Sequence, residues 1–124
     1  MLRVSDLKKS IDFYSKALGM TLIGTFENTQ YRYTLAFLGY VENAETTIEL
    51  THIWDADTYQ LGNGFGHIAI GVEEIDQAVA QILLQGGEVT RKPVVMLGGK
   101  SITAFAKDPD GFMIELIQVT KNNT

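Results

Sequence analysis

The segment His67–Val72, with the sequence HIAIGV, decides the fold and leads directly into residues 73–84. Aliphatic side chains alternate along this segment, which is the period of a half-buried strand. Behind it, apolar residues recur at the helical spacing i, i+4, i+7, at Ile75, Val79 and Ile82. The sequence therefore predicts a short strand that is followed at once by an amphipathic helix.

The same pattern occurs earlier in the chain, so the sequence contains an internal repeat. A shift of 68 residues keeps the order of matching positions, which are Val4 with Val72, Leu7 with Ile75, Ile11 with Val79, Gly19 with Gly87, and Ala36-Phe37 with Ala104-Phe105. A shift of 66 residues aligns residues 48–50 with residues 114–116, both of which read Ile-Glu-Leu. A difference in loop length between two copies produces such a change of shift.

Each copy is predicted to contain a strand, a helix and three further strands. In the first copy the later strands are expected near residues 20–26, 31–40 and 46–52, and in the second near residues 88–91, 101–107 and 112–119. The turn-like segment Asp108-Pro109-Asp110-Gly111 joins the last two as a tight hairpin. We therefore predict an α+β fold of two βαβββ modules, about 1–55 and 64–120, within one domain, 1–124.

Composition excludes several classes of function. A chain of 124 residues suits one domain, and the absence of cysteine excludes disulfides, thiolate metal sites and thiol nucleophiles. A net charge of −5 disfavours nucleic acid or an anionic membrane as a partner. The sequence has no apolar run of about 20 residues and no signal peptide at its start. We therefore expect a cytoplasmic protein.

Two glutamates stand at equivalent positions of the two copies, Glu49 and Glu115. A glutamate between aliphatic residues often marks only the solvated side of a strand. However, period-two alternation places Met113 and Ile117 on the same face as Glu115, and such a face is not a solvated one. The repeat therefore indicates that each copy points a carboxylate into a common concavity.

One of the two histidines is a candidate metal ligand. His67 shares its strand face with the small residues Ala69 and Gly71, as in a cavity wall, although a lone strand histidine can be purely structural. Together with two inward carboxylates it would suit a divalent metal. His52 alternates onto the face opposite Glu49, so we interpret it as structural or interfacial. The first-copy counterpart of His67 falls at position −1, and we expect the chain to begin at an internal methionine.

Several blocks of the sequence are similar to those of glyoxalase I, the lactoylglutathione lyase family. They are Met1-Leu2-Arg3-Val4, Ser10–Tyr14, Leu18-Gly19-Met20, Ile48-Glu49-Leu50-Thr51, Gly64–Ile68 and Asp108–Phe112. The family belongs to the vicinal oxygen chelate superfamily of paired βαβββ modules. The resemblance implies isomerisation of the methylglyoxal–glutathione hemithioacetal to S-lactoylglutathione, and a homodimer with sites at the subunit interface.

The resemblance also implies roles for individual residues. Glu115 would be the principal base and a metal ligand, and Glu49 the opposed ligand and a candidate second acid–base group. His67 would be the imidazole ligand, and the family's other metal histidine would fall two residues before Met1. Members without long insertions usually prefer nickel or cobalt over zinc.

Basic residues would bind the glutathione co-substrate. Arg3 matches a family arginine that contacts the glutamyl carboxylate, an anion that suits a guanidinium. Arg91, Lys92 and Lys100 flank the loop 93–99, where the family has a mobile cover and a basic contact to the glycyl end. A solvated turn is the alternative interpretation of these three residues.

Two other functions remain open from the sequence. His67, Glu49 and Glu115 could serve another metalloenzyme of the same fold, a ring-cleaving oxygenase or an epoxide-opening transferase. A metal-poor protein that sequesters a small ligand, as antibiotic-binding relatives do, is the alternative from a different class.

Overall fold

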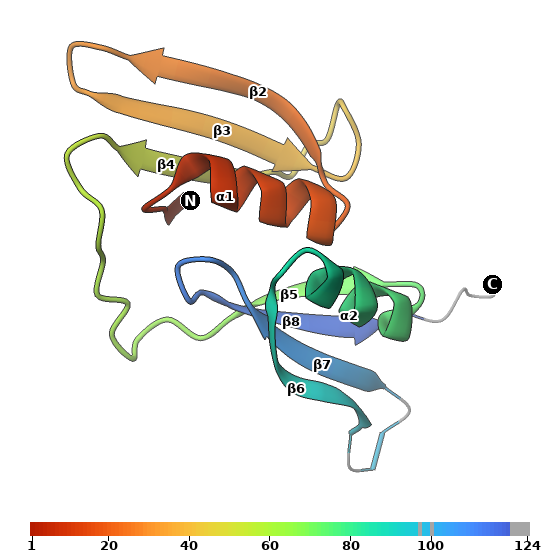
Figure 1. Ribbon diagram of the computed structural model, residues 1–124. Coiled ribbons are helices and arrows are strands. Elements are labelled where there is room, and N and C mark those ends of the chain that lie inside the picture. Colours follow the sequence, from red (N-terminus) through yellow and green to blue (C-terminus); the bar gives the residue numbers. More distant parts are fainter. Residues whose placement is uncertain (97, 100, 120–124) are drawn as a thin grey trace. The chain divides into compact units, whose positions relative to one another are not determined.

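The computed structural model describes residues 1–96, 98–99 and 101–119. The chain divides into two compact units, Met1–Gln60 and Leu61–Thr124. Each unit contains a four-stranded sheet and a helical segment (Figure 1). Within the described part of the chain, no helix is long and apolar enough to cross a membrane.

The first unit has a mixed sheet in the strand order β1-β4-β3-β2. Its elements are β1 (Leu2–Arg3), α1 (Leu7–Asp12), the π-helical turn η1 (Phe13–Ala17), β2 (Thr21–Asn28), β3 (Tyr33–Gly39) and β4 (Ile48–Ile53). Strand β1 pairs with β4 in parallel, and the other pairs are antiparallel.

The second unit repeats this arrangement in the strand order β5-β8-β7-β6. Its elements are β5 (Ile68–Val72), α2 (Ile75–Leu84), β6 (Glu88–Val95), β7 (Ile102–Lys107) and β8 (Met113–Gln118). Leu2 lies opposite Leu50 in the first sheet, as Ile70 lies opposite Leu116 in the second. The prediction of two βαβββ modules is therefore confirmed.

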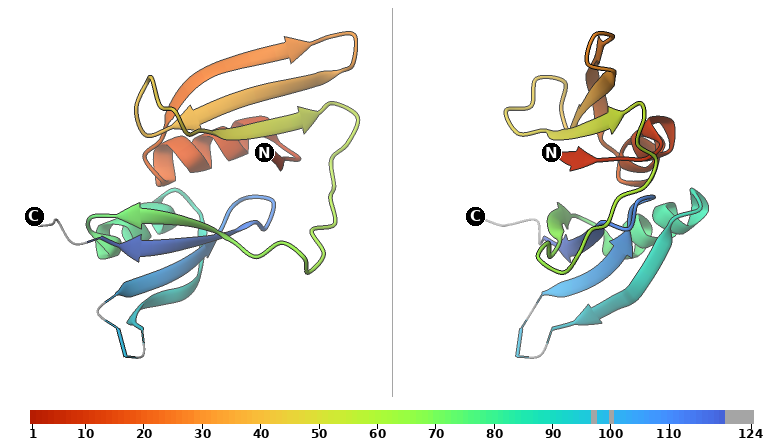
Figure 2. Two further views of the ribbon diagram at one scale, coloured as in Figure 1. Left: turned by 180° about the vertical axis from the view of Figure 1, so that it is seen from behind. Right: turned by 90° about the vertical axis from the view of Figure 1, so that its left-hand side faces the viewer.

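A helix covers one face of each sheet, and the core of each unit lies between the two layers (Figure 2). The helices pack there because their apolar stripes match the aliphatic faces of the strands. The largest fully buried side chains are Val4, Ser10, Tyr14, Leu38 and Leu50 in the first unit, and Ile75, Ile82, Ile114 and Leu116 in the second.

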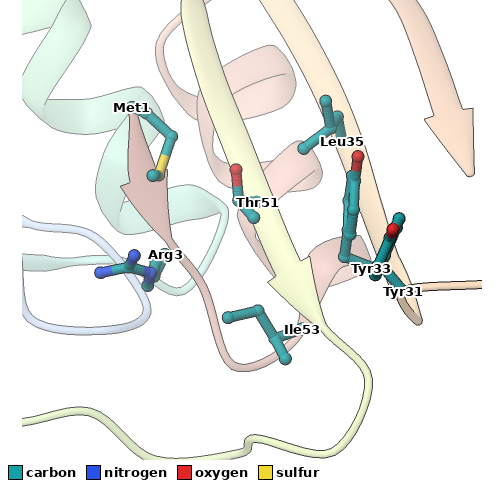
Figure 3. A pocket seen from close by; sticks show the side chains of 7 residues that line it. All are labelled: Met1, Arg3, Tyr31, Tyr33, Leu35, Thr51 and Ile53. Atoms are coloured by element: carbon teal, nitrogen blue, oxygen red, sulfur yellow. The ribbon is translucent and has the colours of Figure 1, made fainter. Parts of the chain in front are cut away.

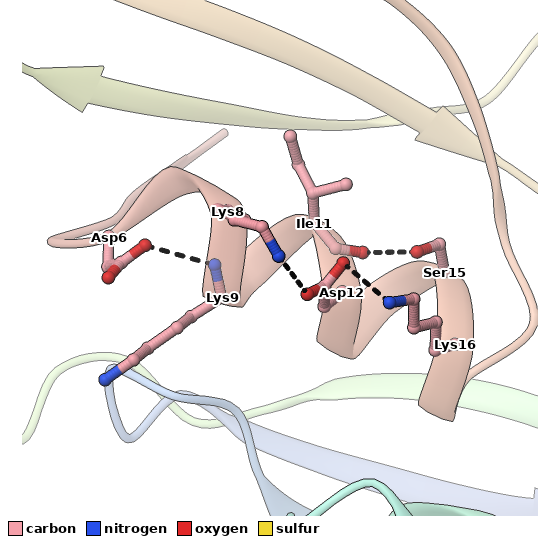
Figure 4. A network of polar contacts seen from close by, with 7 residues as sticks. All are labelled: Asp6, Lys8, Lys9, Ile11, Asp12, Ser15 and Lys16. Carbon is pink, nitrogen blue, oxygen red and sulfur yellow. Dashed lines mark hydrogen bonds and ion pairs between the residues drawn. The ribbon is translucent and has the colours of Figure 1, made fainter.

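Helix α1 begins at a capping aspartate, and a row of charges runs along the exposed side of α1 and η1 (Figure 4). Asp6 Oδ1 accepts a hydrogen bond from Lys9 N at 3.1 Å, as expected of a residue at a helix N-cap. Asp12 lies between Lys8, 3.1 Å away, and Lys16, 3.5 Å away. The hydrogen bond from Lys8 lowers the pKa of Asp12, but such exposed pairs contribute little stability.

The alignment of Gly19 with Gly87 is wrong by one residue. The left-handed residues that end the two helical segments are Gly19, with φ +77°, and Gly86, with φ +81°. The first segment holds one additional residue in η1, where Leu18 N donates to Phe13 O in the i→i−5 pattern of a π-turn. Equivalent residues of β2 and β6 are consequently separated by one residue fewer than equivalent residues of the two helices.

Strand β6 is longer than expected from the sequence. The sequence pattern predicts a strand that ends near Arg91 and a loop over residues 93–99, but the strand continues through Pro93 to Val95. Proline lacks an N–H donor, and it is tolerated here because β6 is an edge strand, paired among the described residues with β7 alone. The register is irregular between Arg91 and Val94, on either side of this proline.

The turn between β7 and β8 is organised by a buried aspartate. Asp108 Oδ1 accepts hydrogen bonds from Asp110 N and Phe112 N, both at 2.9 Å, and Gly111 supplies the positive φ of +92°. Asp108 is only 5% exposed, and its hydrogen bonds from Phe112 N and Asp110 N are buried and partly buried, respectively. The hairpin predicted for this segment is confirmed.

Replacing Asp108 by alanine is expected to lower the free energy of unfolding by about 1–3 kcal/mol, because buried donors lose their acceptor. Urea denaturation measures this loss. The exposed Asp57 provides a matched control, since Asp57→Ala should change stability by no more than about 0.5 kcal/mol. Equal stabilities of the two variants would contradict this account of the turn.

Candidate active site

Glu49 and Glu115 occupy equivalent places in their two sheets. Glu49 on β4 lies opposite Phe37 on β3, and Glu115 on β8 lies opposite Phe105 on β7. Leu50 beside Glu49, and Ile114 and Leu116 beside Glu115, are fully buried on the opposite face of their strands. Alternation therefore turns both carboxylates toward the sheet face that the helix does not cover.

Glu115 has an imidazole beside it. His67 immediately precedes β5, the parallel neighbour of β8, and its Nε2 lies 3.5 Å from Glu115 Oε2. The carboxylate is the more buried member, with 19% of its side chain exposed against 42% for His67. The structure thus brings together two of the three predicted metal ligands within one unit.

His52 faces away from Glu49, as the alternation predicts. Its Nδ1 lies 3.2 Å from the carbonyl oxygen of Val4, so the ring joins β4 to the end of the first strand. This contact gives His52 a structural role.

Arg3 lines a pocket of about 390 Å³ on the open face of the first sheet (Figure 3). Thr51, its register partner on β4, also lines the pocket, and Thr51 Oγ1 lies 3.4 Å from Glu49 Oε2. The remaining walls are apolar or aromatic and are formed by Met1, Tyr31, Tyr33, Leu35 and Ile53. A guanidinium beside aromatic walls suits a ligand that combines an anionic group with an apolar one.

The sequence pattern does not predict the aromatic wall of this pocket. Tyr31, Tyr33 and Leu35 alternate at period two, so they share one face of the chain segment. That signal was available, but it does not show that this face adjoins Arg3. Only the pairing of β3 with β4, which places Leu35 opposite Thr51, establishes their proximity.

An ion pair between Arg32 and Asp55 lies at the end of the first sheet. Arg32 donates through Nε and Nη2 to the two carboxylate oxygens of Asp55, each at 2.9 Å. These hydrogen bonds hold the pKa of Asp55 below its ordinary value and raise that of Arg32. Arg32 also lies over the Trp54 ring at 5.3 Å, and Trp54 Nε1 donates to Thr34 Oγ1. The contacts brace the segment that follows β4.

The basic residues predicted near residues 93–99 have different surroundings. Arg91 is half-buried on β6, where its guanidinium lies over the Phe105 ring at 4.6 Å and donates to Thr103 Oγ1. Lys92 is exposed. Lys100 lies outside the described residues.

The donor chemistry of Glu49, His67 and Glu115 fits a divalent metal, because carboxylate oxygens and an imidazole nitrogen are ligands that such ions take in proteins. Across residues 1–96, 98–99 and 101–119, no three His, Asp or Glu side chains form a cluster that could hold a metal ion. Glu49 belongs to the first unit, and the His67–Glu115 pair to the second. The three candidate ligands therefore do not all belong to one unit.

Comparisons with known proteins agree on one family. The model of the Glyoxalase/Bleomycin resistance protein/Dioxygenase superfamily matches residues 1–116. A probable lactoylglutathione lyase of Vibrio cholerae is 54% identical over 95% of this chain and 86% of its own length. The lactoylglutathione lyase of Escherichia coli O157:H7 is 51% identical, over 95% of this chain and 88% of its own.

Solved structures show the same likeness. Glyoxalase I from Zea mays superimposes with a TM-score of 0.92 and 40% identity, over 98% of this chain. The chain spans only 44% of the maize chain. The trypanothione-dependent glyoxalase I of Leishmania major has a TM-score of 0.81 and 37% identity, over 95% of this chain and 83% of its own.

Proposed function

We propose that this chain, which belongs to the lactoylglutathione lyases of the Glyoxalase/Bleomycin resistance protein/Dioxygenase superfamily, converts the methylglyoxal–glutathione hemithioacetal to S-lactoylglutathione. This reaction removes methylglyoxal. The observation that carries the proposal is the His67–Glu115 pair on the open sheet face, in a chain about half identical to enzymes of that name. The reaction moves hydrogen between adjacent carbons, which calls for a positioned base.

Glu115 acts as that base. Its carboxylate takes the proton from the hydroxyl-bearing carbon of the hemithioacetal and delivers a proton to the neighbouring carbonyl carbon. The hydroxyl proton ends on the other oxygen, so the product is a thioester with an adjacent hydroxyl group and no atom is gained or lost. The partial burial of Glu115 supports this role, because a base that is shielded from water keeps the proton for transfer.

Glu49, His67 and Glu115 would hold a divalent metal, with nickel or cobalt preferred over zinc. When bound, the metal supplies positive charge that stabilises the negative charge developing on the two adjacent substrate oxygens. Glu49 is the opposed ligand and the second acid–base group, on the strength of its equivalence to Glu115 in the repeat.

Arg3, Arg91 and Lys100 bind the charged ends of glutathione. Arg3 binds the glutamyl carboxylate. The position of its guanidinium in the wall of the first unit's pocket supports this role. Arg91 and Lys100 serve the glycyl end.

The protein is a cytoplasmic homodimer whose sites lie at the subunit interface. Membership of the glyoxalase family supports this arrangement, since members without long insertions are typically homodimers with interfacial sites. We expect sedimentation velocity to show the active species at twice the mass of the 13.7 kDa chain. An active species that sediments as a monomer would contradict the dimer.

An isomerisation assay tests the function. The metal-free protein is supplied with Ni²⁺, Co²⁺ or Zn²⁺ and mixed with methylglyoxal and glutathione, and the thioester product is measured. We expect turnover with nickel or cobalt, less with zinc and none without metal. Trypanothione serves as the comparison thiol, because the Leishmania major relative is described as dependent on it.

The two alternative functions give different results in this assay. If no metal yields the thioester, the lyase proposal fails. Oxygen uptake with a catechol would then favour a ring-cleaving oxygenase. Tight binding of the hemithioacetal with no turnover would favour a ligand-binding protein.

A further inference from the structure

Phe105 lies on β7, between Arg91 on one neighbouring strand and Glu115, a member of the proposed catalytic pair, on the other. Its partner on β6 is Arg91, and its partner on β8 is Glu115. The Arg91 guanidinium carbon lies 4.6 Å from the centre of the Phe105 ring. The His67 ring meets the same phenyl ring edge to face, with centroids 5.3 Å apart and planes at 79°. One aromatic ring therefore contacts both Arg91 and His67.

Arg91 is held in place on this ring. Its Nη2 donates to Thr103 Oγ1 and lies 4.0 Å from Met96 Sδ. Its Nε is buried, and among the described residues it has no hydrogen-bond acceptor. No ion pair found in the described ranges includes Arg91. Since none of the ion pairs among the described residues involves this guanidinium, the electron-rich ring face stabilises its charge.

His67, in contrast, has few constraints of its own. It lies just before β5, outside the paired strand, and 42% of its side chain is exposed. Within the described residues, its ion-pair and ring contacts are Glu115 Oε2 at 3.5 Å and the Phe105 ring. The orientation of the imidazole therefore depends on Phe105.

The first unit offers an internal comparison. Phe37 lies opposite Glu49 there, as Phe105 lies opposite Glu115. The β2 residue opposite Phe37 is Gly24, which has no side chain to place on the ring. The sheet therefore forms without such a cation, and Arg91 is not needed at this position for strand pairing.

We propose that Phe105, held by Arg91, is a positioning residue that fixes the imidazole of His67 relative to the Glu115 carboxylate. The use of this pair in catalysis rests on the proposed lyase function. The orientation of the ring does not, so it can be measured in the metal-free protein. Groups that orient a metal ligand typically change metal affinity by about 10- to 100-fold when they are removed.

The test is nuclear magnetic resonance of the metal-free protein at one pH. The wild type should show nuclear Overhauser contacts between the His67 and Phe105 rings, and ring-current shifts of the His67 carbon-bound protons. Phe105→Leu should remove the shifts and leave the imidazole averaging over rotamers. Phe105→Tyr, which keeps the ring, should restore them. Phe37→Leu makes the same change in the first unit and should leave the His67 signals unaltered.

Calorimetric titration with Ni²⁺ gives the second readout. Phe105→Leu should weaken binding about 10- to 100-fold, and Phe105→Tyr should bind within a few-fold of the wild type. Unchanged His67 signals together with unchanged Ni²⁺ affinity in Phe105→Leu would overturn the proposal.

A variant at Arg91 covers the case in which Phe105→Leu does not fold. Arg91→Gln removes the cation and keeps Phe105, so the His67 ring-current shifts should decrease, and unaltered shifts would contradict the role of Arg91. Failure of the wild type in the isomerisation assay would overturn the lyase function alone, because these signals are read without substrate.

Discussion

Replacing Glu115 by glutamine is expected to lower kcat by about 10²- to 10⁴-fold, the usual contribution of a positioned acid–base group. The amide keeps the size of the side chain but cannot accept the proton from carbon at neutral pH. The fold should be kept, because Glu115 lies on the open face of the sheet, away from the buried Ile114 and Leu116. The isomerisation assay with Ni²⁺ measures the loss, and circular dichroism checks the fold.

Two further variants make this result specific. Glu88→Gln is the same chemical change at an exposed carboxylate at the start of β6, and it should leave kcat unchanged. Glu49→Gln should also reduce kcat, but by less than Glu115→Gln, because Glu115 is proposed as the principal base. Turnover within a few-fold of the wild type in Glu115→Gln would remove this residue from its assigned role. A larger loss of kcat in Glu49→Gln than in Glu115→Gln would make Glu49 the principal base and Glu115 the second acid–base group.

Replacing Leu116 by alanine is expected to lower the free energy of unfolding by about 2–5 kcal/mol, as large-to-small changes in a packed core do. Leu116 is fully buried, and it pairs in register with Ile70 on β5 and Ala104 on β7. The cavity lies in the middle of the sheet, where the neighbouring strands limit relaxation. Urea denaturation followed by circular dichroism measures the shift in the midpoint.

The repeat supplies a partner for this test. Leu50 is the counterpart of Leu116 in the first unit and is equally buried, so Leu50→Ala should cost a similar amount. Leu84, with 76% of its surface exposed at the end of α2, provides the control, because Leu84→Ala should change stability by less than about 0.5 kcal/mol. A cost for Leu116→Ala as small as that of Leu84→Ala would contradict the assignment of the core.

Much of the fold could be predicted because its signals are local and repeated. The alternation at His67–Val72 and the spacing of Ile75, Val79 and Ile82 describe one module, and their recurrence describes the second. The errors arose where chain geometry departs from the usual pattern. The first helical segment contains one additional residue because it ends in a π-turn. Strand β6 continues past Pro93 because it lies at the edge of its sheet.

The candidate site was predictable in its residue types and faces, but not in its contacts. Alternation assigns Glu49 and Glu115 to one kind of face and His52 to the other, and the structure agrees. The aromatic wall of Tyr31 and Tyr33 beside Arg3 was not predicted. Both tyrosines are far from Arg3 along the chain, and the alternation within a strand does not predict which strand pairs with it.

By itself, the sequence determined the duplicated βαβββ module and the face on which each candidate residue lies, because side-chain direction follows from backbone periodicity within one element. Only the tertiary structure decided that Arg91, Phe105 and Glu115 form one row across three strands, with the His67 ring against Phe105. Strand order and register set such contacts, and they depend on the packing of helix against sheet and on details as small as one extra residue in a helical turn.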